Sequence, residues 1–178
     1  KSIGLAALMA RAGMLLPCSG QPSLPWCAQI LADIGDEQSI QHSLSTFSAH
    51  VATINSILSV ATPGSLVLID EIGAGTDPRE GAALGIALIQ ELLRKQVAVV
   101  CTTHHAELKI YAHTNQKITN ASTEFNTDTL QPTYRLLMGI PGESNAIAIA
   151  SRLGLPSSVI DAARLELGAK ERDLSSML

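Results

Sequence analysis

Residues 66–81 read LVLIDEIGAGTDPREG, an apolar run that ends in two adjacent acids, Asp70 and Glu71. Strands that are buried on both faces of a parallel sheet are continuously apolar, because helices cover both faces. Residues 65–71 therefore predict such a strand, with both carboxylates at its carboxyl end. Since ligands of open parallel sheets bind beyond that end, the two acids are candidates for a functional site.

The residues after the acids predict the rest of a strand–helix–strand unit. Residues 77–96 have helical spacing, with Asp77 as the N-cap and Pro78 in the first turn. Residues 97–104 begin with five apolar residues and predict a second buried strand. Such a succession is a βαβ unit with a right-handed crossover. The fold class that we predict is α/β, a parallel sheet flanked by helices.

The remaining segments extend this pattern on both sides. We expect helices over residues 2–16 and 47–61, a loop over 17–25, a short strand over 27–35, shorter strands over 117–126 and 132–139 in a hairpin or at a sheet edge, and two C-terminal helices over 144–154 and 155–170. Ser43 or Ser45 is the expected cap of the second helix. The two C-terminal helices, broken by Gly-Leu-Pro, have the shape of a helix–turn–helix.

Composition limits the classes of function. Of 178 residues, 46% are apolar and 16% charged, and the net charge of −4 without a basic run gives no general attraction to nucleic acid. Three cysteines without CxxC spacing favour reduced thiols in the cytoplasm. Arg11 interrupts the apolar opening, which disfavours a secretory signal, and no run approaches the roughly 20 apolar residues that cross a membrane.

The paired acids have a functional interpretation and a purely structural one. Asp70 can hold Mg²⁺ through water, and Glu71 can polarise a water for attack on a phosphoryl group. Alternatively, both are solvated turn residues, and the pair alone does not decide between the two. The next strand ends in Thr103 and His104, which we expect at the same sheet edge. His104 would donate to a γ-phosphate or to the attacking water, although a histidine there is more often structural.

Other motifs are weaker by themselves. His105 is expected to begin the next helix and to point away, and zinc ligation by the histidines with Cys101 fits no common spacing. Gly73 and Gly75 permit a tight loop after the acids. The hydroxyl-rich stretch at residues 42–47 is either an anion site at a helix start or a simple cap, which the residues alone favour. No phosphate-binding loop of the form G-x-x-x-x-G-K-[ST] occurs in the chain.

Taken together, four stretches resemble the ATPase domain of the MutS family within the ABC-type ATPase superfamily. LVLIDEIGAGTDPREGAAL resembles the Walker B segment and following loop, STF the family signature, TTHHAEL the histidine switch, and GIPGESNAIAIASRLGLPSSVIDAAR the C-terminal helical segment. The match is most similar to the bacterial second-paralogue branch, which lacks the mismatch-reading domain. The fold implied is a P-loop NTPase-like parallel sheet followed by a helix–turn–helix.

The resemblance implies ATP and Mg²⁺ as cofactors and a role for each matching residue. Asp70 would assist Mg²⁺, Glu71 would activate water and His104 would sense the γ-phosphate. In a head-to-tail homodimer with composite ATP sites, Ser45 and Thr46 would contact the nucleotide of the other subunit. Asp77 would lie in the loop that communicates across the dimer, so the resemblance favours a trans-acting site at residues 42–47.

The resemblance also implies a longer parent protein. The family's phosphate loop lies just upstream of a segment like KSIGLAALMARAG, so we expect residues 1–140 to be a partial ATPase domain without that loop and the first strand. Residues 141–178 would be a helical dimerisation segment, because Asp161 and Glu166 offset its few cations and disfavour direct reading of DNA. An ABC transporter or chromosome-maintenance ATPase is a poorer match.

The function implied for the parent is ATP hydrolysis coupled to clamping nucleic acid, without a membrane. The nucleic acid would be mismatched or branched DNA, in DNA repair and recombination control, or ribosomal RNA, in ribosome rescue, and it would bind mainly through other parts of the protein. The branch usually carries a small C-terminal nuclease module. The alternative is that this chain alone is a dimerisation and binding module that does not hydrolyse ATP.

Overall fold

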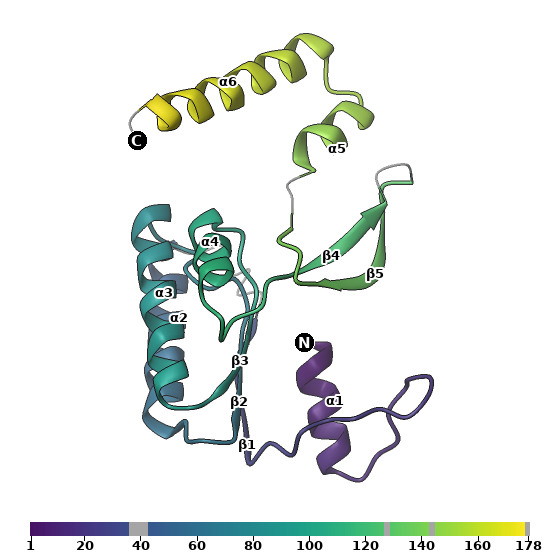
Figure 1. The fold of residues 1–178 in the computed structure, drawn as a ribbon, viewed down its shortest axis with the longest axis vertical. Coiled ribbons are helices and arrows are strands. Elements are labelled where there is room, and N and C mark those ends of the chain that lie inside the picture. Colours follow the sequence, from purple (N-terminus) through teal and green to yellow (C-terminus); the bar gives the residue numbers. More distant parts are fainter. Residues whose placement is uncertain (36–42, 127–128, 143–144, 177–178) are drawn as a thin grey trace. The chain divides into compact units, whose positions relative to one another are not determined.

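The computed structural model describes residues 1–35, 43–126, 129–142 and 145–176, of which 43–46 and 168–176 are described by their backbone only. The chain divides into two compact units, residues 1–111 and 112–178. Both units are drawn in Figure 1. The predicted domain boundary between residues 140 and 141 stays a prediction.

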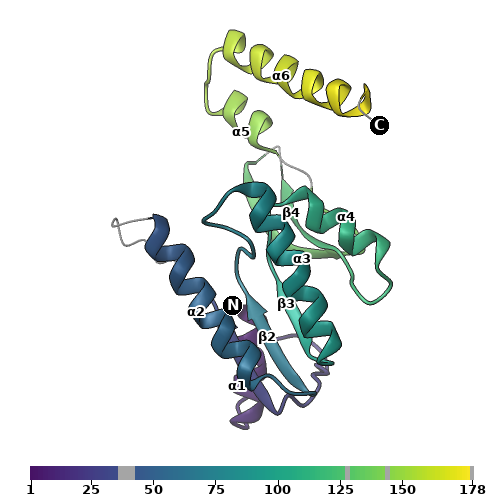
Figure 2. The ribbon, with the colours of Figure 1, turned by 90° about the vertical axis from the view of Figure 1, so that its left-hand side faces the viewer.

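The first unit contains α1 (Ser2–Arg11), β1 (Gln29–Asp33), α2 (Ser43–Val60), β2 (Ser65–Ile69), α3 (Pro78–Arg94), β3 (Ala98–Cys101) and the start of α4 (Ala106–Thr114). Its three strands form a parallel sheet in the order β1-β2-β3. Helix α1 covers one face of the sheet, and α2 and α3 cover the other (Figures 1 and 2). The predicted α/β class is confirmed.

The central strand is the best-buried element of the sheet. Every residue of β2 is buried, and Val67 and Ser65 are fully inaccessible to solvent. On the side of α1, Ala7 and Cys27 pack with Leu66 and Leu68. A side chain on Gly4 would collide with Leu68, so the glycine allows α1 to approach the sheet closely. The apolar run is therefore continuous because β2 is buried on both faces, as the sequence predicts.

Two sequence predictions in this unit are corrected. The pattern of residues 97–104 predicts a strand buried like β2, but β3 lies at the edge of the described sheet, where Val100 is 38% exposed. The spacing of the first helix predicts that it extends to residue 16, but α1 ends at Arg11. Gly13, with φ of +72°, adopts the left-handed conformation that ends helices.

The second unit contains the antiparallel hairpin of β4 (Ala121–Asn126) and β5 (Gln131–Met138), followed by α5 (Ala146–Arg152) and α6 (Ser157–Ser176). The predicted hairpin and the predicted pair of C-terminal helices are therefore confirmed. Gly154, with φ of +91°, provides the break between the two helices. Among the described residues, no helix has both the length and the apolar character that crossing a membrane requires.

The burial of α3 predicts where the first unit is most sensitive to mutation. Leu92 is fully buried and Leu84, on the same helix, is 53% exposed. We expect Leu92→Ala to lower the free energy of unfolding by about 2–5 kcal/mol, because it leaves a cavity as well as losing buried surface. Leu84→Ala is the matched control and should lower it by less than about 1 kcal/mol. Urea unfolding followed by circular dichroism measures both, and equal effects would contradict the assigned burial.

Candidate nucleotide site at the carboxyl edge of the sheet

Register between the strands brings the candidate residues to one edge. Asp33 pairs with Ile69 across β1 and β2, and Ile69 pairs with Cys101 across β2 and β3. The residues that follow β2 and β3, Asp70 and Thr102, are therefore neighbours at the carboxyl end of the sheet. This is the position at which ligands of parallel sheets bind.

Thr102 connects the two acids. Its hydroxyl donates to Asp70 Oδ1 over 2.5 Å and accepts a hydrogen bond from the Glu71 amide over 2.8 Å. The backbone continues the connection, because the Ile72 amide donates to the Thr102 carbonyl over 2.9 Å. One hydroxyl thus fixes the carboxylate of Asp70 and the backbone of Glu71. Sequence reasoning singles out Thr103 and misses Thr102.

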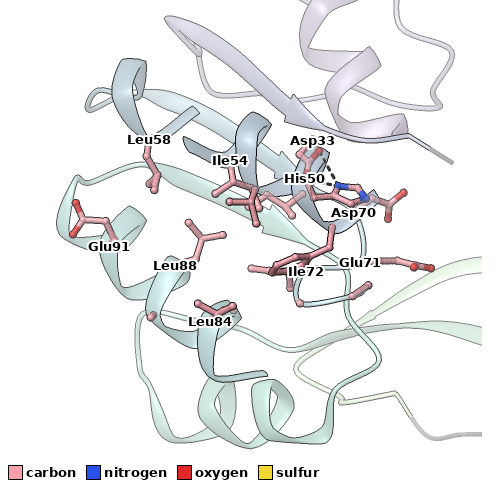
Figure 3. A pocket seen from close by; sticks show the side chains of 17 residues that line it. Asp33, His50, Ile54, Leu58, Asp70, Glu71, Ile72, Leu84, Leu88 and Glu91 are labelled. Carbon is pink, nitrogen blue, oxygen red and sulfur yellow. Dashed lines mark hydrogen bonds and ion pairs between the residues drawn. The ribbon is translucent and has the colours of Figure 1, made fainter. Parts of the chain in front are cut away.

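Backbone conformation explains why the chain turns at the acids. Glu71 has φ of +52°, a left-handed conformation that is strained for a residue other than glycine. Its side chain is exposed, and Figure 3 shows it directed away from the apolar residues of the unit. The loop then passes close to α3 at Gly73, where a Cβ would collide with the Gly81 carbonyl. The predicted tight loop is confirmed.

Of the two histidines after β3, His104 has the expected environment and His105 does not. His104 is exposed and follows β3 at the same edge, as predicted, although its ring contacts His105, with ring centroids 4.6 Å apart. His105 precedes α4 and is expected to point away, but it is only 6% exposed. That prediction is wrong because the space beside Gly73, which has no side chain, accommodates the His105 ring. Its Nε2 atom is buried without a hydrogen-bond partner.

The loop after the acids ends at the predicted cap. Asp77 Oδ1 accepts hydrogen bonds from the amides of Arg79 over 3.0 Å and Glu80 over 3.2 Å, with Pro78 at the start of α3. This confirms Asp77 as the N-cap, and its expected role across a dimer stays a prediction.

The hydroxyl-rich stretch is described only in part. Helix α2 begins at Ser43, so Ser43 and Ser45 both lie inside it and the prediction that one of them is its cap is wrong. The residues just before Ser43 are outside the described ranges. The side chains of Ser45 and Thr46 are also outside the described part of the chain. Their expected contact with a nucleotide stays a prediction.

A pocket of about 330 Å³ extends from the acids along the sheet between α2 and α3. Figure 3 shows apolar side chains of the two helices facing each other across it, among them Ile54 and Leu88. At the end nearest the acids, His50 Nδ1 lies 2.9 Å and 3.1 Å from the two carboxylate oxygens of Asp33. Sequence reasoning missed this pair, because the two residues are 17 positions apart and neither belongs to a recognisable motif.

The oxygen donors at the edge fit magnesium better than zinc. Mg²⁺ binds proteins through one or two carboxylates and completes its shell with water and phosphate oxygens. Asp70 provides such a carboxylate, with its Oδ2 atom 3.8 Å from Lys1 Nζ and a side chain 33% exposed. Burial raises the pKa of the Cys101 thiol, so it stays protonated and is a poor zinc ligand. Among the described residues, no group of three or more His, Cys, Asp or Glu side chains is placed to hold a metal.

A parallel sheet with paired acids after its central strand and Thr102 and His104 after the neighbouring strand defines a P-loop-like α/β protein. The family model described as MutS domain V matches residues 1–170. The chain belongs to this family, which confirms the resemblance.

Sequence identity to named relatives supports the family assignment. The chain is 50% identical over 178 residues to "Endonuclease MutS2" of Brevibacillus brevis. It is 47% identical over 196 residues to the protein of that name from Synechocystis sp. and 49% identical over 178 residues to that of Shouchella clausii. Each alignment covers 100% of this chain but only 23% or 24% of the relative. The chain therefore spans about a quarter of the length of these relatives.

The hydrogen bond from the Glu71 amide to Thr102 can be tested by hydrogen exchange of that amide. Thr102→Val keeps the shape of the side chain and removes the hydroxyl, so the Glu71 amide loses its acceptor. We expect its hydrogen exchange, measured by NMR, to accelerate by about tenfold or more. Thr102→Ser should restore protection. The Ile72 amide is the internal control, because it donates to the Thr102 backbone; unchanged exchange at Glu71 in Thr102→Val would contradict the assigned bond.

Proposed function

We propose that this chain is the ATPase domain of a MutS-like DNA-binding protein that hydrolyses ATP with Mg²⁺ as a head-to-tail homodimer. The observation that carries the proposal is the pair of acids at the carboxyl edge, where Thr102 is bonded to the carboxylate of Asp70 and to the backbone amide of Glu71. Membership of the MutS domain V family supports the same class of chemistry. The term full-length form denotes this chain within a polypeptide of the length of its relatives.

Each residue at the edge has a role in this proposal. Bound Mg²⁺ would neutralise the charge that develops on the phosphates. Asp70 would hold the ion through water, and Thr102 keeps its carboxylate oriented. Glu71 would take the proton of the attacking water, because its exposed carboxylate lies at the same edge and can accept a proton. His104 is exposed at the same edge and would donate to the γ-phosphate.

The phosphates would be held by a loop that the 178 residues do not contain. We place this loop upstream of Lys1, on a strand that pairs with β3. Among the described strands, β3 pairs with β2 alone and its Val100 is 38% exposed, which fits a further strand on that side. The relatives are longer than this chain, which covers only 23% or 24% of them, so such a loop has room outside these 178 residues.

Dimerisation and nucleic acid binding belong to the same proposal. Ser45 and Thr46 at the start of α2, and Asp77 at the start of α3, would act on the nucleotide or the loop of the partner subunit. The relatives' name supports a protein that acts on nucleic acid, and we propose mismatched or branched DNA, or ribosomal RNA, as the polymer clamped. The net charge of −4 indicates that most of the binding surface lies outside this chain. A dimerisation module without hydrolysis is the second candidate.

Glu71 distinguishes the two candidates. In the full-length form, Glu71→Ala should lower the rate of ATP hydrolysis by about 10²-fold or more, because general-base catalysis contributes that much. ATP affinity should change less than about threefold, because the residue acts on water rather than on the nucleotide. Glu80→Ala, another exposed acid nearby, is the matched control. Parallel loss of binding and hydrolysis in Glu71→Ala would contradict the role of Glu71.

Composite sites predict complementation between two inactive variants. Ser45→Ala and Glu71→Ala should each hydrolyse ATP slowly as homodimers. In a mixed dimer, one site combines the intact Glu71 of one protomer with the intact Ser45 of the other. Equal mixing should therefore recover about a quarter of the wild-type rate, since half the dimers are mixed and each has one intact site. Failure to recover any activity would mean that Ser45 does not act across the dimer.

A further inference from the structure

The pair formed by Asp33 and His50 links α2 to the sheet edge that carries the acids. Asp33 is the last residue of β1 and only 8% exposed, and both of its carboxylate oxygens lie within 3.1 Å of His50 Nδ1. The Asp33 carbonyl accepts a hydrogen bond from the Asp70 amide over 2.9 Å. A continuous chain of polar contacts therefore leads from α2 through Asp33 to the first acid.

Apolar packing alone holds this part of α2 weakly. Among residues 47–60, Ile57 is the α2 residue that is buried, and it lies in the second half of the helix. Nearer the start of the helix, Val51 is 46% exposed and lines the pocket that separates α2 from α3. In the first half of the described helix, the polar contact with the sheet therefore adds to limited packing, to which Phe47 contributes by its approach to Gly75.

His50 is close in sequence to the expected partner-facing residues. It follows Thr46 by four positions, which is about one helical turn, so its contact with Asp33 helps to position the first turn of α2. A rigid helix transmits a shift at His50 to its N-terminal end. Displacement of a reacting group by about 1 Å can lower a rate by about 10²-fold.

We propose that Asp33 and His50 are a positioning pair, which fixes the first turns of α2 relative to Asp70 and Glu71. The pair would thereby align residues 45–47, the family signature that would act on the partner's nucleotide, with the edge of the sheet in the same chain. This inference rests on the proposed function. It adds the requirement that α2 is held in a defined position relative to the acids. The pair should affect the rate of hydrolysis in the dimer and leave the binding of ATP to one protomer nearly unchanged.

The first test measures the position of α2 without any nucleotide. His50→Leu removes the contact, whereas His50→Asn keeps an amide donor close to the position of Nδ1. Hydrogen exchange with mass spectrometry should show about tenfold faster exchange over residues 47–54 in His50→Leu, with β2 unchanged and with protection largely restored in His50→Asn. Unchanged exchange over residues 47–54 would overturn the proposal, as would faster exchange throughout the sheet, which indicates a general structural role.

The second test separates this inference from the proposed function. In the full-length form, His50→Leu should lower kcat about tenfold with ATP affinity changed less than about twofold, and His50→Asn should recover most of the rate. His113→Leu, at an exposed histidine of α4, is the matched control. Hydrolysis that depends on Glu71 but not on His50 would overturn this inference alone. Hydrolysis that does not depend on Glu71 would overturn the proposed function and this inference with it.

Discussion

The carboxyl edge of the sheet depends on the register between β2 and β3. Because Ile69 pairs with Cys101, the next residue on each strand meets the other, and Thr102 reaches both acids. A shift by one residue would turn every side chain of β3 to the opposite face and separate Thr102 from Asp70. The contacts of Thr102 lie where the buried strand β2 ends. Glu71, with its left-handed backbone, and the glycine loop follow directly.

Much of this architecture follows from local patterns in the sequence. The apolar run before Asp70, the cap at Asp77 and the hairpin signals each depend on neighbouring residues, and the structure confirms them. The expectation for β3 failed because apolar composition does not distinguish a central strand from one at the sheet edge. Similarly, α1 ended early because Gly13 stops a helix that hydrophobic spacing alone would continue.

Contacts between distant residues could not be predicted in the same way. Asp33 and His50 are joined only because β1 and α2 pack together, and neither residue is marked by a cap, a turn or a metal spacing. The outward orientation expected for His105 is wrong because its burial depends on Gly73, which is far away in sequence. Thr102 was missed for a related reason, since only the strand register shows which of two adjacent threonines faces the acids.

In the function proposed above, the edge defined by Asp70 and Glu71 receives Mg·ATP. Titration calorimetry of ATP into the full-length form, with and without Mg²⁺, tests it most directly, with Asp70→Asn as the variant and Asp161→Asn as the control at an exposed acid of α6. We expect tighter binding with Mg²⁺ and loss of that difference in Asp70→Asn alone. Binding that is indifferent to Mg²⁺, or an Asp70→Asn variant that responds like the wild type, would contradict it.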